Sequence, residues 1–191
     1  RPIVDRLHVL DAEQTVFLRR LARRTWAFFD AHVGATDNAL PPDNMQEHPV
    51  ARIAHRTSPT NIGFALLAAL AAREFGYLTT RRLLARVDAT LTTMQGMERH
   101  RGHFYNWYDT QTLQPLRPRY VSTVDSGNLA GQLLTLRAGL VALADAPLLA
   151  PAWLDGLHDT LGVVRESLES RLEAAERRSI ASALAALDEA V

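Results

Sequence analysis

Two segments of this chain have the pattern of helices that are apolar on almost every face, and each follows a long polar loop. The first runs from Ser58 through Leu70 and the second from Ser126 through Leu136. Both open with a serine, continue through an asparagine and a glycine, and then reach paired leucines. A helix that is apolar all round is stable only when most of its sides are covered. A chain with two such helices must therefore pack helix against helix.

The two segments also predict a repeated structural unit. Asn61 and Asn128 hold equivalent positions in them, 67 residues apart, and each segment is followed by a more amphipathic helix. Repeated helical hairpins with a buried inner member and an amphipathic outer member are typical of an α/α toroid. In that architecture the loops that enter the inner helices line a central pocket. The alternative is that these are two ordinary buried helices of an all-α bundle.

The rest of the chain is helical in pattern as well, and no stretch alternates as a strand would. Apolar residues recur at helical spacing over 11–33, after Thr79 or Thr80, from about Ala152 to Arg171, and over 173–191. Ser58 as N-cap and Pro59 as the first helical residue begin one apolar helix, and Asp125 or Ser126 begins the other. We therefore expect an all-α fold of about six helices, in which helical hairpins form an α/α toroid.

Composition limits the class of partner. The 191 residues are 47% hydrophobic and 22% charged, which is enough apolar material for one folded domain with a core. The formal net charge is zero, so no nucleic-acid partner is expected, because a phosphate-binding surface carries a clear cationic excess. The sequence has no cysteine and therefore no thiolate zinc site. It also has no apolar run long enough to span a bilayer, so we expect no membrane contact by this chain itself.

No cofactor and no metal are expected either. The sequence lacks phosphate-binding and dinucleotide-binding fingerprints. His100 and His103 are close together, but no Glu or Cys completes a metal motif around them. His55 and Arg56, just ahead of Ser58, are candidates for donating hydrogen bonds to sugar hydroxyls. The alternative is that they anchor the loop to a neighbouring carboxylate.

A cluster of aromatic residues lies in the loop that starts at Arg101 and leads into the second apolar helix. Phe104, Tyr105, Trp107 and Tyr108 fall within five positions. An irregular loop cannot bury all of them in one core, so some must lie at a surface or a cleft. Aromatic faces stack on the apolar C–H faces of sugar rings, and amides and carboxylates bind the hydroxyls. The loop therefore predicts a sugar-binding cleft.

Carboxylates are the next requirement, because glycoside chemistry uses two of them on either side of the scissile bond. The helix macrodipole at the start of the second apolar helix favours an ionised Asp125, which suits a hydrogen-bond acceptor better than a proton donor. The alternative for Asp125 is a simple N-cap, and Asp109 has an alternative as the residue that closes an Asx turn. No pair stands out among the five loop carboxylates, which are Asp37, Asp43, Glu47, Asp109 and Asp125.

Four segments taken together resemble a known family. LPPDNMQE, HRTSPTNIG, RGHFYNWYDT and PRYVSTVDSGNLAG, in this order between Leu40 and Gly131, are similar to the central glucoamylase-like region of cyclic β-1,2-glucan synthases. The resemblance implies large, multi-domain proteins of a bacterial inner membrane. It also implies a module that elongates β-1,2-glucan from UDP-glucose, a phosphorylase-like module that trims it, and a central (α/α)6 module associated with closing the ring by transglycosylation.

For this chain the resemblance implies that the helical hairpins form part of an (α/α)6 toroid, an incomplete barrel, and that residues 1–191 are one partial toroid domain of a larger polypeptide on the cytoplasmic side of the membrane. Its partners are then a β-glucan oligosaccharide and the remaining domains, and apolar flanks where further hairpins belong favour a homo-oligomer. The catalytic carboxylates are expected partly or wholly beyond Val191, with Asp43, Glu47 and Asp109 as weak candidates. The motif residues expected to bind substrate, together with His55 and Arg56, are Asn61, Asn106, Trp107, Tyr108, Asp109, Tyr120, Asp125 and Asn128.

Two other functions fit the same residues. In one, the chain is a non-catalytic all-α scaffold whose aromatic loop docks a protein partner, since aromatic residues and Arg are favoured at protein interfaces. In the other, it is part of a glucoamylase-like hydrolase that acts on another glucan. The isolated chain is expected to be inactive in each case, because a complete toroid of this kind needs twelve helices.

Overall fold

The structure is a computed structural model that describes residues 9–147 and 151–171. Helices dominate this part of the chain, so the expected all-α fold class is confirmed. The helix expected over 173–191 lies outside the described residues. Among the described residues, no helix is both long and apolar enough to cross a membrane. The helices are α1 (Ala12–His32), the 3-10 turn η1 (Ala35–Asp37), α2 (Pro59–Glu74), α3 (Thr80–Gly96), α4 (Thr123–Leu143) and α5 (Ala152–Arg171).

Side-chain caps fix where the helices begin. At α2 the Ser58 hydroxyl accepts a hydrogen bond from the Asn61 amide at 3.2 Å, with proline at the first helical position as the sequence predicts. Thr79 caps α3 in the same way. The predicted start of α4 is wrong by a few residues, because Ser122 is the cap and accepts from the backbone amide of Asp125 at 3.1 Å. The Asp125 carboxylate is therefore left available for other contacts.

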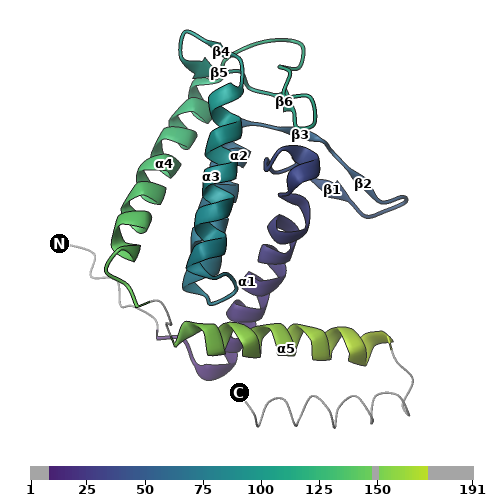
Figure 1. Ribbon diagram of the computed structural model, residues 1–191. Coiled ribbons are helices and arrows are strands. Elements are labelled where there is room, and N and C mark those ends of the chain that lie inside the picture. The colour runs from purple at the N-terminus through teal and green to yellow at the C-terminus, as the bar shows by residue number, and fades with distance from the viewer. Residues whose placement is uncertain (1–8, 148–150, 172–191) are drawn as a thin grey trace, which may run out of the picture.

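The first four helices alternate in direction, with α1 and α3 running one way and α2 and α4 the other (Figure 1), and α2 packs against the other three. The two apolar helices, α2 and α4, consequently run in the same direction. The long loops over 33–58 and 97–122 lie at one end of the molecule, where both of these helices begin (Figure 1). This common end is where a toroid would have its pocket.

The packing of α2 against α4 is the most extensive contact between these helices. Gly63 of α2 lies against the side chain of Gln132, and Gly139 of α4 lies against Leu70, so a Cβ at either glycine would meet its neighbour at under 2.5 Å. Helix α3 covers another side of α2. The buried core between these helices and the loops includes Trp26, Leu40, Ile62, Leu66, Ala69, Leu83, Val87, Met94, Tyr108, Leu129 and Leu136.

Short strands order the two long loops. β1 (Met45–Gln46) and β2 (Arg52–Ile53) form a hairpin that projects from the body of the molecule (Figure 1). β4 (Arg99–His100) and β5 (His103–Phe104) form a second hairpin. The third pair joins the loops to each other, because β3 (Arg56–Thr57) is antiparallel to β6 (Tyr108–Asp109). Strands of two residues leave no alternating pattern in a sequence.

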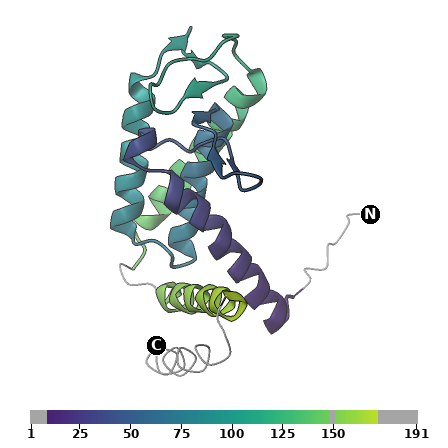
Figure 2. The same ribbon diagram turned by 90° about the vertical axis from the view of Figure 1, so that its right-hand side faces the viewer.

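Helix α5 lies across the lower end of α1 rather than beside α4 (Figures 1 and 2). Arg19 of α1 pairs with Asp159 of α5 at 2.9 Å, and the Tyr77 hydroxyl donates to the same carboxylate at 2.8 Å. Burial of Tyr77, helped by its hydrogen bond to Asp159, raises the pKa of the Tyr77 hydroxyl. The hydroxyl therefore remains a donor across the physiological pH range.

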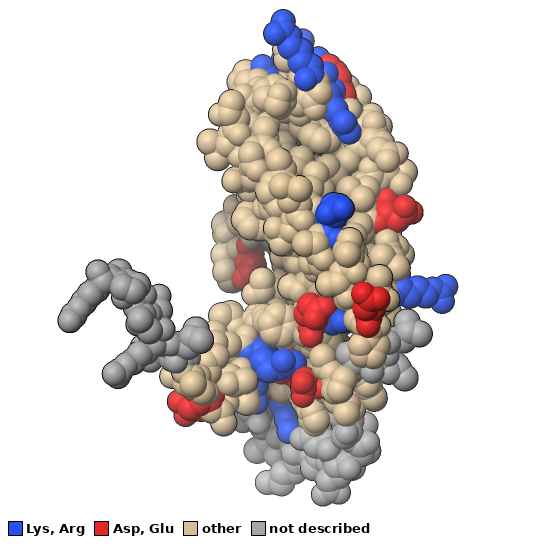
Figure 3. All heavy atoms as spheres, turned by 90° about the vertical axis from the view of Figure 1, so that its left-hand side faces the viewer, with Lys and Arg blue, Asp and Glu red and all other residues tan. Residues whose placement is uncertain are grey.

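Helix α4 is much less buried than its sequence predicts. The expectation that both apolar helices are covered on most sides holds for α2 but is wrong for α4, where only Leu129 and Leu136 are buried. The reason is that, among the described residues, α4 packs mainly against α2. Its outer side carries a stripe of apolar and small residues and faces the viewer in Figure 3, where charged side chains are sparse. We call this the α4 stripe: Val124, Gly127, Gly131, Leu134, Ala138 and Val141.

The α4 stripe predicts that the isolated chain self-associates. Exposed contiguous apolar surface of this kind normally marks an interaction face, and Val141 is 61% exposed within it. We expect Val141→Glu to shift the chain towards monomer in sedimentation velocity experiments over a concentration series. Burying a carboxylate in an apolar contact is strongly unfavourable.

The matched control is Val50→Glu, because Val50 is exposed to the same degree, 60%, but lies in the β1–β2 hairpin. It should leave the sedimentation profile unchanged. A wild-type chain that stays monomeric at high concentration, or an equal effect of both substitutions, would contradict the prediction.

Candidate functional site

Asp43 anchors one side of the loop end. Its Oδ2 accepts two hydrogen bonds from Arg56, from Nε at 3.1 Å and from Nη2 at 2.9 Å. Its Oδ1 accepts a hydrogen bond from the side-chain amide of Asn61, from Nδ2 at 3.2 Å. The Asp43 side chain is 18% exposed, so this two-pronged pair is partly shielded from solvent. Such geometry fixes the guanidinium of Arg56 in a plane. Asp43 thus holds the first loop against the first turn of α2.

Arg56 connects the first loop to the second loop. Its guanidinium carbon lies 5.0 Å from the centre of the Trp107 ring, in cation–π contact. Strand pairing explains why these residues meet, because Arg56 lies opposite Asp109 in the β3–β6 register and so comes beside Trp107. One loop therefore supplies a cation to a ring of the other.

Asn106 is the hub of the second loop and is buried. Oriented to satisfy its neighbours, its amide donates to Asp125 Oδ2 at 2.9 Å and accepts from Trp107 Nε1 and the Tyr120 hydroxyl, both at 2.8 Å. Its backbone amide also donates to the Tyr120 carbonyl at 2.8 Å. Asn106 therefore fixes two aromatic side chains at once.

Asp125 and Thr60 connect this hub to the entries of both apolar helices. The Thr60 hydroxyl, in the first turn of α2, donates to Asp125 Oδ1 at 2.7 Å. The Asn128 amide, one turn further along α4, donates to the Thr60 oxygen at 3.2 Å. The side chains of the two helix entries are thereby joined directly.

These contacts form one continuous set, which we call the helix-entry network. It brings together seven residues that the sequence predicts as substrate-binding, and adds Asp43 from the weak catalytic candidates. Thr60 is the member that sequence reasoning missed. A signal for it existed, because a threonine directly before Asn61 occupies the first turn of an inner helix. The members are Asp43, Arg56, Thr60, Asn61, Asn106, Trp107, Tyr120, Asp125 and Asn128.

The network favours binding over proton transfer. Both carboxylates, Asp43 and Asp125, accept hydrogen bonds on both oxygens, so neither has an oxygen free of protein partners. The groups open to a ligand include Tyr120, which is 46% exposed, the partly exposed Trp107, the exposed Asn128 and the half-exposed Arg56. Rings flanked by amides are suited to hold a sugar.

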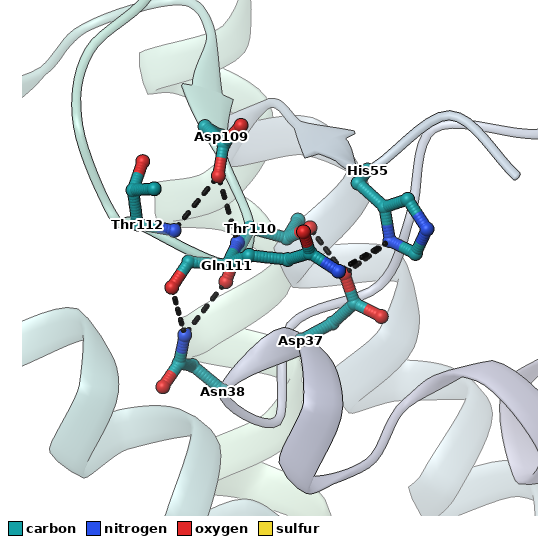
Figure 4. Close-up of polar contacts among 7 residues, drawn as sticks. All are labelled: Asp37, Asn38, His55, Asp109, Thr110, Gln111 and Thr112. Carbon is teal, nitrogen blue, oxygen red and sulfur yellow. Dashed lines mark hydrogen bonds and ion pairs between the residues drawn. The ribbon is translucent and has the colours of Figure 1, made fainter.

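His55 lies outside this network. His55 Nδ1 is 2.7 Å from Oδ1 of Asp37, which is buried, and the Thr110 hydroxyl donates to the same oxygen. Asn38 donates its amide to the carbonyls of Thr110 and Gln111 at 2.8 and 3.0 Å (Figure 4). Of the two roles that the sequence leaves open for His55, the contact with a neighbouring carboxylate is the one observed. We call this group, with Asp109 and Thr112, the Asp37 cluster.

Asp109 closes the turn at the edge of the Asp37 cluster. Its Oδ1 accepts from the backbone amides of Gln111 at 2.9 Å and Thr112 at 2.7 Å (Figure 4). The hydrogen bond from the Thr112 amide is the main cause that lowers the pKa of this carboxyl. A carboxyl with a lowered pKa is a poor proton donor. The structure therefore supports the Asx-turn alternative for Asp109.

Tyr108 is a core residue, so its prediction as a substrate-binding residue is wrong. Its side chain is 0% exposed. Its hydroxyl donates to the Glu98 carbonyl and accepts from the Tyr105 amide, both at 2.7 Å. Burial raises the pKa of this hydroxyl to about 12. Trp107 and Tyr108 are neighbours on an extended segment, and side chains of such neighbours point to opposite faces, so burial of Tyr108 leaves Trp107 on the opposite face.

The remaining candidates lie apart from the helix-entry network. Glu47 is exposed in the loop of the projecting β1–β2 hairpin. His100 and His103 lie opposite each other in the β4–β5 hairpin. Among the described residues no group of three or more His, Cys, Asp or Glu side chains is placed to hold a metal ion.

Comparison with known proteins agrees with the motif resemblance. No protein-family profile matches the chain. The chain is 45% identical over 161 residues to the cyclic β-(1,2)-glucan synthase NdvB of Rhizobium meliloti (strain 1021). The resemblance to cyclic β-1,2-glucan synthases is confirmed. The match takes in 84% of this chain but only 6% of the synthase, so this chain corresponds to a small part of the synthase.

Solved structures show the fold. A putative glucoamylase from Bacteroides fragilis NCTC 9343 matches 84% of this chain with a TM-score of 0.56 at 18% identity. An endo-β-1,2-glucanase from Chitinophaga pinensis matches 81% with a TM-score of 0.54 at 16% identity. The matched region is 37% of each of these chains. The expected fold, an incomplete portion of a glucoamylase-like (α/α)6 toroid, is therefore confirmed.

The turn role of Asp109 makes a prediction about stability against pH. A carboxyl whose pKa is lowered on folding stabilises the fold above its unfolded pKa, near 4, and this contribution is lost as the pH falls through the folded value. We expect Asp109→Ala to cost about 1 kcal/mol in free energy of unfolding at neutral pH, as loss of a capping side chain does. Asp109→Asn should cost less, because its oxygen still accepts both amides.

Urea unfolding of wild type and Asp109→Asn at several pH values checks this. The difference in free energy of unfolding should be largest at neutral pH and should shrink towards zero below the folded pKa. Asp88→Asn, a substitution at an exposed site of α3, serves as the control and should show no such convergence. A difference that grows in acid would contradict the assignment.

Proposed function

We propose that this chain is a glucan-holding part of a module that binds and processes β-1,2-glucan. The observation that carries the proposal is the helix-entry network, which holds Trp107 and Tyr120 in place beside unburied amides at the start of both apolar helices. Stacking aromatic rings with adjacent amides match the alternation of apolar ring faces and hydroxyls in a glucan. The 45% identity to a cyclic β-1,2-glucan synthase supports this choice of glucan.

We propose further that the chain, residues 1–191, is one partial toroid domain within a larger polypeptide on the cytoplasmic side of a bacterial inner membrane. The match covers only 6% of the synthase, which supports the larger polypeptide. The other domains of that polypeptide are then its permanent partners. The α4 stripe is a face suited to such a neighbour, because it is apolar and uncovered in the described chain.

The reaction that we propose for the whole module is transglycosylation. In a retaining mechanism one carboxylic acid protonates the departing glycosidic oxygen, and a second carboxylate forms the glycosyl intermediate. A glucan hydroxyl then takes up the glucosyl unit in place of water, and the site must exclude water for that acceptor to win. Asp43 and Asp125 have both oxygens occupied by hydrogen bonds. We therefore place the reacting carboxyls in the part of the module outside this chain.

Ring closure and hydrolysis remain distinguishable by products. Names of two structural relatives include β-1,2-glucanase, which favours hydrolysis as the competing reaction. Incubation of linear β-1,2-glucan with the intact parent module separates them. Cyclic product supports transglycosylation, and shortened linear chains as the main product contradict it.

Glucan binding by the chain itself is the direct test. We expect saturable binding of linear and cyclic β-1,2-glucan in isothermal titration calorimetry. Trp107→Ala should weaken it roughly tenfold or more, because loss of an aromatic contact of about 1.4 kcal/mol corresponds to that factor. Trp153→Ala is the matched control, since Trp153 is exposed on α5 at the opposite end of the molecule.

Two results would sink the sugar-binding proposal. One is the absence of saturable glucan binding to the wild-type chain. The other is binding that is equally strong in wild type and Trp107→Ala. In either case the scaffold alternative, with the aromatic loop docking a protein, becomes the better account of the chain.

A further inference from the structure

A single residue, Asp125, sets which groups of the helix-entry network donate hydrogen bonds and which accept them. An ionised carboxylate can only accept hydrogen bonds. The Thr60 hydroxyl therefore donates its one proton to Asp125 Oδ1, and its oxygen is left to accept from the Asn128 amide. On the other side, Asn106 must turn its NH2 group towards Asp125 Oδ2.

The orientation of Asn106 then decides what the aromatic side chains meet. With its NH2 group on Asp125, its oxygen faces Trp107 Nε1 and the Tyr120 hydroxyl, both at 2.8 Å. The indole N–H is a donor and has no acceptor capacity. A reversed Asn106 amide would set two donors against each other at Trp107. The acceptor character of Asp125 is thus passed through Asn106 to both rings.

We propose that Asp125 and Thr60 are positioning residues which, through Asn106, hold the Trp107 and Tyr120 rings in the orientation that receives the glucan. This inference rests on the proposed function and deepens it. It reassigns Asp125 and Asn106 from contacts with sugar to control of the contacts. Thr60 acts as a positioning residue because its hydroxyl donates the hydrogen bond to Asp125 Oδ1.

Local structure keeps Asp125 in place. It lies in the first turn of α4. Its backbone amide is held by the Ser122 cap at 3.1 Å. The partner on the opposite side, Thr60, is in the first turn of α2. The ring orientation therefore depends on how the two helix entries sit relative to each other.

The decisive substitution is Asp125→Asn, which keeps the size of the side chain but removes its obligatory acceptor character. An asparagine offers one acceptor oxygen and one NH2 donor where Asp125 offers two acceptors. One of its partners, Thr60 or Asn106, must then accept instead of donate, so the Asn106 amide is free to reverse. Thr60→Val removes the other donor at constant shape. Thr135→Val is the matched control on α4, because its hydroxyl bonds only the Gly131 carbonyl within the helix, at 3.0 Å.

The readout that a merely structural role would not move is the indole N–H resonance of Trp107 in NMR spectra of the ¹⁵N-labelled full chain. Trp107→Phe assigns it among the three tryptophans. We expect Asp125→Asn and Thr60→Val to move this resonance and to speed its exchange with solvent, while Trp26 and Trp153 stay unchanged. Thr135→Val should leave all three resonances in place.

The second measurement is the affinity of each variant for linear β-1,2-glucan, determined by titration. Both positioning variants should weaken glucan binding about two- to tenfold, the factor expected for one lost hydrogen bond. An unchanged Trp107 resonance in Asp125→Asn overturns the inference even if glucan binds. A shifted resonance with unaltered glucan affinity overturns it as well, since the rings would then not need this control. If wild type binds no glucan, the proposed function fails, and the resonance alone shows whether Asp125 sets the ring.

Discussion

The antiparallel pairing of β3 with β6 is the contact on which the loop end of this molecule depends. It joins two irregular loops through residues that are 51 positions apart in the sequence, with Thr57 opposite Tyr108. Both of these residues are 0% exposed, so the pairing is also where the loops enter the core. Because side chains alternate along an extended segment, burial of Tyr108 turns Trp107 outwards. The pairing also delivers Arg56 to that ring, at 5.0 Å.

Helix direction accounts for the place of the candidate site. The two apolar helices run in parallel, so the small polar side chains of their first turns lie side by side. Close approach needs small residues between the helices, and Gly63 against Gln132 supplies it one turn below. The polar groups at the entries, Thr60 and Asp125, are then near enough to bond at 2.7 Å. Packing in the apolar part thus sets the spacing of the polar part.

Sequence reasoning reached the helices and most of the network, for identifiable reasons. Caps such as Ser58 with Pro59 mark helix starts locally, and α5 was placed correctly at Ala152–Arg171. It failed where a side chain's direction depends on a long-range contact. The β3–β6 pairing has no periodic signal, so the sequence could not separate outward Trp107 from buried Tyr108. The same limit applies to α4, because an apolar helix does not reveal whether its partner is present.

The open side of α4 and the ordered helix-entry network are compatible because they depend on different contacts. Every member of the network comes from the two loops or from the first two turns of α2 and α4, and these parts are held by the α2–α4 packing and by β3–β6. The α4 stripe continues down the helix to Val141, away from these contacts. Covering the stripe would therefore add stability to α4 without being required to orient Trp107. Orienting Trp107 and covering the α4 stripe are, in this chain, separable properties.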